Sequence, residues 1–274
     1  MLVTVVIPTY HPKDYLWKTL DSLQTQTLPA EDFEVIVVLN GDIEPYDAQI
    51  RAYIEMAPSQ FHIQLLTTKT PGVSNARNIA IDAARGTYLT FLDDDDWVSP
   101  VYIEDLLRHA DEDTVVASMV KNYIQHDGTY SEDYLAHAFE RCSKMATISL
   151  TEGRSLLSSS CCKIIPRAVI ADARFDTDIT HGEDALFMTT ISPRIKALRL
   201  SSPEAIYYRR VHTASASRHS RGLVLRMRNT LKLFWRYLRM FFQPKRYDTK
   251  FILTRLLACI KRFFVEIKLT LTTK

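Results

Sequence analysis

The sequence lacks any long uncharged apolar run, and it contains few cysteines. No stretch of its 274 residues is apolar over the length that a membrane-spanning helix needs. The four cysteines form no Cys-x-x-Cys pair, so we expect reduced thiols and a cytoplasmic location. The apolar run that starts at Leu2 has no preceding basic residues and no small-residue cleavage site. It therefore indicates a first strand, stopped by Pro8, and not a signal peptide.

Glycine and acidic residues are also scarce in particular places. The chain has only seven glycines, and no glycine-rich phosphate loop follows the first strand, which argues against a nucleotidyltransferase. From Arg221 to Lys274 there are 14 Lys and Arg but only two acids, Asp248 and Glu266, a net charge of +12. The remainder has 20 Lys and Arg against 30 acids, a net charge of −10. We therefore expect these two parts to meet different partners.

The first hundred residues alternate between strand and helix patterns. Apolar strands are expected at residues 2–7, 33–39, 61–66 and 87–92, with helices near 16–23, 47–56 and 73–85. Such alternation predicts an α/β fold in which helices flank a mainly parallel sheet. Ligands bind sheets of this kind at the carboxyl ends of the strands. Polar clusters follow three of the expected strands, so we expect a site there.

The chain is less regular after residue 98. A helix at residues 100–110, strands at 115–120, 161–165 and 205–210, and a helix at 183–191 are expected. Residues 127–145 show no clear period, and we expect a loop or flap. From Gly222 onward the apolar residues have helical spacing, which is broken at Pro244. This predicts a domain at residues 1–220, with halves at about 1–98 and 99–220, followed by a basic amphipathic helical tail at 221–274.

Four consecutive carboxylates, Asp93 to Asp96, follow the strand at residues 87–92 and precede Trp97. Like charges this close raise one another's energy of ionisation unless a cation neutralises them. Oxygen ligands of this kind suit Mg or Mn, which commonly bridge to substrate phosphates. The alternative is a solvated turn in which one or two aspartates, Asp96 among them, cap the next helix. That alternative does not explain all four.

Four segments together resemble family 2 glycosyltransferases, which have the GT-A fold, a Rossmann-like mixed sheet. They are Val-Val-Ile-Pro-Thr-Tyr (5–10), Gly-Val-Ser-Asn-Ala-Arg-Asn (72–78), Gly-Thr-Tyr-Leu-Thr-Phe-Leu-Asp-Asp-Asp-Asp-Trp (86–97) and His-Gly-Glu-Asp (181–184). The resemblance covers roughly residues 3–215. It implies inverting transfer of a sugar from a nucleotide-diphosphate donor, with a divalent metal, Mn or Mg, holding the diphosphate. Cell-surface polysaccharide or glycolipid synthesis is the process that we expect.

The resemblance also implies donor-binding residues. Asp93 and Asp95 match the Asp-x-Asp motif that holds the metal and donor, with Asp94 and Asp96 as alternatives because the register of four aspartates is ambiguous. Nucleobase contacts are implied for Pro8, Thr9 and Tyr10. Asn40 stands where many relatives carry an aspartate that hydrogen-bonds the base, which weakens the assignment of uracil in preference to guanine, and Asp42 is its alternative. The remaining implied donor contacts are Arg77, His212, for which metal ligation is the alternative, and Arg209 or Arg210.

Two neighbouring acids are the expected catalytic residues. Inverting transfer needs one base that deprotonates the acceptor hydroxyl. Asp184 matches the family's base, and Glu183 is expected to position the acceptor or to exchange roles with it. An alternative is that both acids simply stabilise a helix N-terminus.

In the tail, cations flank an aromatic and apolar stripe, which is typical of a helix lying on an anionic membrane. We therefore expect the tail to contact the inner face of a membrane, where a lipid-linked or glycan acceptor would lie. A hairpin packed on the catalytic domain is the structural alternative, and nucleic-acid binding is less favoured. A homo-oligomer is compatible with the sequence.

Two other functions compete with transfer from a nucleotide sugar, for which a UDP-sugar is the favoured donor. Residues 94–98 fit an Asp-x-Asp-x-Val phosphatase pattern, but that reading leaves Glu183, Asp184 and the Ala-Arg-Asn motif unexplained. A non-catalytic sugar-nucleotide-binding protein of the same fold would have lost the base or the metal aspartates, and neither is lost.

Overall fold

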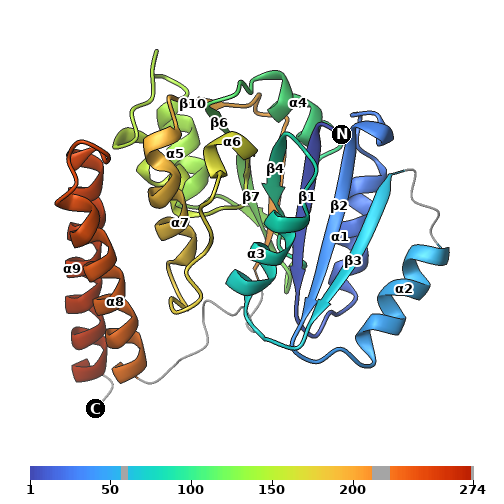
Figure 1. Ribbon diagram of the computed structural model, residues 1–274, viewed down its shortest axis with the longest axis horizontal. Coiled ribbons are helices and arrows are strands. Elements are labelled where there is room, and N and C mark those ends of the chain that lie inside the picture. Colours follow the sequence, from blue (N-terminus) through green and yellow to red (C-terminus); the bar gives the residue numbers. More distant parts are fainter. Residues whose placement is uncertain (57–60, 212–222, 273–274) are drawn as a thin grey trace.

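The computed structural model describes residues 1–56, 61–211 and 223–272, with side chains described as far as residue 266 (Figure 1). Among the described residues, seven strands form a central sheet in the order β10-β6-β9-β4-β1-β2-β3. These strands are β1 (Val3–Thr9), β2 (Phe33–Asn40), β3 (His62–Thr68), β4 (Tyr88–Phe91), β6 (Thr114–Ala117), β9 (Lys163–Pro166) and β10 (Ala197–Leu200).

The central sheet is parallel except at β9. Strands β1, β2, β3 and β4 pair in parallel, as do β6 and β10. Strand β9 pairs antiparallel with both β4 and β6 and so joins the two parallel groups. A smaller sheet, in the order β5-β11-β7-β8, contains β5 (Trp97–Val98), β7 (Met119–Ile124), β8 (Thr129–Ser131) and β11 (Ile206–Val211).

Helices flank the sheet, and α3 crosses its front in Figure 1. Every residue of β1 and β2 is buried, as expected for parallel strands covered on both faces. The helices are α1 (Tyr15–Gln24), α2 (Tyr46–Met56), α3 (Val73–Ala83), α4 (Tyr102–Arg108), α5 (Tyr134–Cys142), α6 (Arg167–Ile170), α7 (Glu183–Ile191), α8 (Leu223–Phe241) and α9 (Thr249–Thr272). The predicted α/β class with a mainly parallel sheet is confirmed.

Two local predictions were wrong. Residues 127–145 are not a loop, because they contain β8 and α5. The Asp133 side chain accepts hydrogen bonds from the backbone N–H groups of Leu135 and Ala136 and so caps α5. The first strand does not stop at Pro8, because β1 continues to Thr9 and Pro8 lies in register with Val38 of β2.

Helices α8 and α9 lie side by side as a hairpin at one edge of the molecule (Figure 1). Phe251 and Ile252 on α9 are fully buried, and Leu233 and Tyr237 on α8 are nearly so. Arg255 is also buried and donates hydrogen bonds to Thr189 of α7, to Ser158 and to the backbone carbonyl of Leu157. The expected helical tail is thus packed on the sheet domain. Our division of the chain near residue 220 stays a prediction.

Candidate active site

The aspartate run lies at the carboxyl end of β4, between α1 and β11. The Thr19 hydroxyl on α1 donates to the backbone carbonyls of Asp94 and Asp96 at 3.0 and 2.6 Å. On the other side, the Asp93 N–H donates to the Tyr207 hydroxyl oxygen at 3.2 Å. Contacts from two distant elements therefore hold the backbone of this loop.

The four carboxylates have different surroundings. Asp96 is buried, and its oxygens accept from the Tyr207 hydroxyl and the Arg210 N–H, both at 2.7 Å. It does not cap α4, whose N-cap is Val101. Asp94 accepts from the Thr9 hydroxyl at 2.5 Å. Asp93, Asp94 and Asp95 are all partly exposed, so a ligand can reach these three carboxylates. Of the three, Asp93 and Asp95 match the Asp-x-Asp motif.

The electrostatics of the run fit a divalent cation. Burial, with added repulsion from Asp95 and Asp93, raises the pKa of Asp94 to about 7. Burial and repulsion from Asp95 and Asp184 also raise the pKa of Asp93, against the opposing effect of Arg77. Mg and Mn bind through one or two carboxylates and complete their shell with water and substrate phosphates. Two partly exposed carboxylates at one loop satisfy that requirement.

Arg77 on α3 joins the aspartate run to the expected base. Its Nη2 donates to Asp93 Oδ1 at 2.9 Å, and its Nη1 donates to Asp184 Oδ1 at 2.6 Å. The Arg77 side chain is only 3% exposed, and these carboxylates raise its pKa above the ordinary value despite burial. Asp93 and Asp184 therefore lie in one site, although they are far apart in the sequence. A donor contact by Arg77 stays a prediction.

Asp184 and Glu183 open helix α7. Gly182 precedes them as the N-cap and has a left-handed backbone with a φ of 87°. The Ser160 hydroxyl donates to Asp184 at 3.1 Å. Among the described residues, Glu183 Oε2 is buried and has no hydrogen-bond partner. Burial and then repulsion from Asp184 raise the pKa of Glu183 to about 7, so this carboxyl is partly protonated near neutral pH.

The predicted nucleobase residues lie where β1 and β2 end. The buried Asn40 donates to the Thr9 carbonyl at 2.7 Å and accepts from the Gly72 N–H at 2.8 Å. Its amide thus connects β1, β2 and the start of α3. Tyr10 is 52% exposed, which leaves its ring accessible.

His11, which follows Tyr10, was not predicted from the sequence. Its ring stacks between those of Tyr10 and Tyr46, with ring centroids 3.9 and 5.2 Å apart. Its Nε2 lies 2.6 Å from the Asp42 carboxylate. Ser160 was missed as well. A single His or Ser carries no periodic signal. The one sequence feature that could have indicated His11 is its position just after the carboxyl end of β1.

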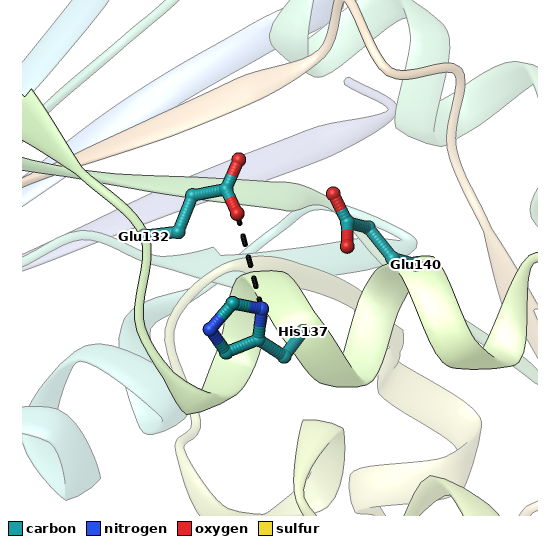
Figure 2. Close-up of side chains that lie close together, drawn as sticks. All are labelled: Glu132, His137 and Glu140. Carbon is teal, nitrogen blue, oxygen red and sulfur yellow. Dashed lines mark ion pairs between the residues drawn. The ribbon is translucent and has the colours of Figure 1, made fainter.

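Other predicted contacts lie elsewhere. Arg209 pairs with Asp133 and Asn122, and Arg210 binds the aspartate loop through its backbone N–H and its Nε. His212 lies outside the described residues. Within the described chain, the one set of three potential metal ligands that converge is Glu132, His137 and Glu140, which are exposed at α5 and outside the aspartate run (Figure 2).

Comparisons with known proteins agree with this geometry. A family model described as "Glycosyl transferase family 2" matches residues 4–173. The chain is 27% identical over 221 residues to "Putative glycosyltransferase EpsH" of Bacillus subtilis, covering 78% of this chain and 62% of that protein. It is 27% identical over 214 residues to "Poly(ribitol-phosphate) beta-N-acetylglucosaminyltransferase TarS" of Staphylococcus aureus, covering 76% of this chain and 35% of that protein. The chain spans less than two thirds of the length of these relatives.

Solved structures show the same fold. S. aureus TarS 1-349 in complex with UDP-GlcNAc has a TM-score of 0.75 at 20% identity, covering 97% of this chain and 73% of that one. "Mannosyltransferase PcManGT from Pyrobaculum calidifontis in complex with GDP-Man and Mn2+" has a TM-score of 0.60 at 15% identity, covering 99% of this chain and 79% of that one. Among the described residues, no helix is both long and apolar enough to span a bilayer.

Proposed function

Because the chain belongs to glycosyl transferase family 2, we propose that it transfers a sugar, with inversion, from a nucleotide-diphosphate sugar to a hydroxyl acceptor. The acceptor is a glycan or a lipid-linked glycan of cell-surface polysaccharide or glycolipid synthesis. The main support for the proposal is the pair of hydrogen bonds that Arg77 donates to Asp93 and Asp184. These bonds hold the carboxylate proposed to meet the donor and the proposed base in one site. We do not favour a phosphatase that uses residues 94–98, because that activity leaves Asp184 and its bond to Arg77 unexplained.

Asp93 and Asp95 are the residues that would hold the metal, Mn or Mg. Such an ion, when bound, stabilises negative charge on the departing diphosphate. Thr9 and Tyr207 support this role by holding the loop on both sides of the two carboxylates. Tyr10, with Asp42 and Pro8 beside it, lies where the nucleobase would bind. The Mn2+ complex of the archaeal mannosyltransferase supports metal use.

Asp184 is the proposed base. Its Oδ1 is bound by Arg77 and Ser160, which orients the carboxyl group and directs its other oxygen to an acceptor hydroxyl. Glu183 would position the acceptor, since its buried Oε2 has no partner among the described residues. With a pKa of about 7, this carboxyl is able to donate or accept a hydrogen bond near neutral pH.

Two variants test these roles separately. Asp184→Asn should abolish transfer and leave nucleotide affinity nearly unchanged, because a base acts mainly in the transition state. Asp95→Ala should instead weaken nucleotide binding in the presence of Mn. Asp172→Asn is the matched control, because that side chain is 91% exposed and lies in a surface ion pair. Normal turnover by the Asp184 variant would refute the role of the base. A nucleotide affinity of the Asp95 variant that equals that of the wild type, both with and without Mn, would refute the metal role.

The donor nucleotide is proposed to be UDP, as in the TarS complex with UDP-GlcNAc. A thermal-shift comparison of UDP-, GDP- and dTDP-sugars with Mn tests this, since a ligand of the native state raises the melting temperature. A larger shift with GDP-mannose, the donor bound by the archaeal neighbour, would overturn the choice of UDP.

We propose further that the α8–α9 hairpin docks on the anionic inner face of a membrane, which makes the enzyme a cytoplasmic peripheral protein. Helix α8 exposes Val224, Leu231 and Trp235, and Phe242 directly after it is exposed too. Helix α9 exposes Leu253, Leu257, Ile260 and Phe264. Residues at these spacings share one face of a helix. Leu231 and Ile260 also line a common groove of about 280 Å³ with Phe234, Phe263 and Phe264. The two stripes therefore form one apolar surface.

Charge favours lipid over a second copy of the chain. Of the two acids in this region, Glu266 pairs with Arg226 and Arg262. Asp248 accepts a hydrogen bond from the Phe251 N–H at the start of α9. In a dimer through this surface, two regions that each carry a net charge of +12 would repel each other. Anionic lipid instead attracts them, and each basic residue near the surface contributes about 1 kcal/mol to binding. The exposed cations of the hairpin are Arg228, Arg239, Lys245, Arg246, Lys250 and Lys261.

Point variants test docking without opening the core. Leu231→Glu and Ile260→Glu should release the protein from phosphatidylserine-containing vesicles in cosedimentation. Met56→Glu is the control, because Met56 is 84% exposed but lies on α2. Vesicle binding that survives both hairpin substitutions would refute the surface. A concentration-dependent dimer that these substitutions dissolve, without vesicle binding, would show that the occupant is a second copy.

A further inference from the structure

The inner face of α8 contacts the segment that leads into the catalytic helix. Asn229 Oδ1 accepts from the Thr180 N–H at 2.8 Å and from the Thr180 hydroxyl at 3.2 Å. Its Nδ2 donates to the His181 carbonyl at 2.7 Å. Asn229 is 7% exposed. One buried amide thus holds both residues that precede Gly182.

Three more residues of α8 extend this contact. The Lys232 ammonium donates to the Asp178 carbonyl at 3.2 Å, and Arg236 Nε donates to the Asp176 carboxylate at 2.8 Å. Leu233 packs against Gly182 so closely that a Cβ there would lie 2.9 Å from Leu233 Cδ1. Residues 229, 232, 233 and 236 share one face of a helix. This face of α8 therefore supports the whole segment 176–182, beside α7 in Figure 1.

That segment determines where α7 begins. Gly182 turns the chain through a left-handed conformation, and Glu183 and Asp184 follow directly. Asp184 is then restrained from two directions. Arg77 and Ser160 bind its carboxyl group, while Asn229 binds the backbone at Thr180 and His181, which lie four and three residues before Asp184. A shift of that backbone would move the carboxyl group relative to the acceptor.

We propose that Asn229 is a positioning residue for the base, a role that rests on the proposed function of Asp184. An apolar side chain would be enough to pack α8 against the segment before α7, as Leu233 does against Gly182. A buried amide has to find partners for both its N–H and its oxygen, and Asn229 finds them on consecutive residues of the segment before the base. Through Asn229, helix α8 therefore helps to position the base, and the hairpin is not only an appendage.

Substitution of Asn229 should lower turnover and spare donor binding. We expect Asn229→Ala to reduce kcat about 10- to 100-fold, since misplacement of a catalytic group by about 1 Å costs a factor of about 100. KM for the donor and nucleotide affinity should stay unchanged. Thr230→Val is the matched control. Thr230 is the next residue on α8, is 2% exposed, and its hydroxyl has no hydrogen-bond partner among the described residues, so its loss should leave kcat unchanged.

A double-mutant cycle separates positioning from a structural role. If Asn229 acts through Asp184, Asn229→Ala should not lower further the residual turnover of Asp184→Asn. An equal loss in both backgrounds, or unchanged kcat in the single variant, would overturn the proposal. Full turnover by Asp184→Asn alone would instead refute the assignment of the base. If the alanine variant does not fold, Asn229→Leu carries the same test, because it fills a similar volume without a charge and removes both the acceptor for Thr180 and the donor to His181.

Discussion

The buried Arg77 allows a prediction whose size follows from its surroundings. Arg77→Met keeps the volume of the side chain and leaves Asp93 and Asp184 without their shared cation. Removing one partner of a buried ion pair costs about 3–5 kcal/mol. Asp93 and Asp184 retain 44% and 20% exposure, so water compensates in part. We therefore expect the lower end, about 3 kcal/mol, or about 6 °C in Tm for a chain of this size.

Urea unfolding and calorimetry at pH 8 in the presence of EDTA measure this loss. Arg51→Met is the control, because Arg51 is 56% exposed and pairs with Asp47 one helical turn away, a contact that contributes about 0.3–0.5 kcal/mol. Asp184→Asn in the Arg77→Met background should restore part of the stability, since it removes one uncompensated charge. A loss for Arg77→Met no larger than that for Arg51→Met would refute the reasoning.

Three further predictions concern the same site. Burial raises the pKa of Glu183 from 4.5 to about 7, so ionisation destabilises the native state and the wild type loses stability as pH rises between these values. Glu183→Gln should therefore be more stable by up to about 3 kcal/mol at pH 8, with no difference at pH 4, in urea titrations; a gain that is independent of pH would contradict this. Gly182→Ala should cost about 1–3 kcal/mol by the same measurement, because a left-handed backbone and Leu233 oppose a Cβ. Tyr207→Phe removes one of the two hydrogen bonds that Asp96 accepts and also the acceptor of the Asp93 N–H. It should therefore weaken binding of UDP with Mn in calorimetric titrations, whereas unchanged affinity would show that the loop needs no such support.

The sheet and most helices of the amino-terminal half were predictable because their patterns are local. Strands β1 and β2 are buried throughout, and their continuous apolar runs are visible in the sequence. Helix α5 was not recognised, because residues 127–142 change from a turn and a three-residue strand to a capped helix, and no single period spans them. The antiparallel direction of β9 has no local signal at all, since it depends on partners in β4 and β6.

The candidate site shows the same division. The aspartate run, Asp184 and Glu183 were predicted from motifs, and the structure places Asp93 and Asp184 on one arginine. His11, Ser160 and Asn229 were not predicted, because their partners lie 31, 24 and 49 positions away along the chain. The role of a single polar residue with distant partners can be inferred only after the fold has brought those partners together.

The placement of β9 has a consequence for the order in which the chain is assembled. Strands β1 to β4 come from the first 91 residues, but β6 and β10 reach them only through residues 163–166. While a ribosome has delivered fewer residues than this, β4 presents a bare edge of unpaired backbone groups, and such edges invite pairing with other chains. Fragments that end near residue 150 should therefore aggregate, and nascent chains of that length are the ones that most need protection by a chaperone.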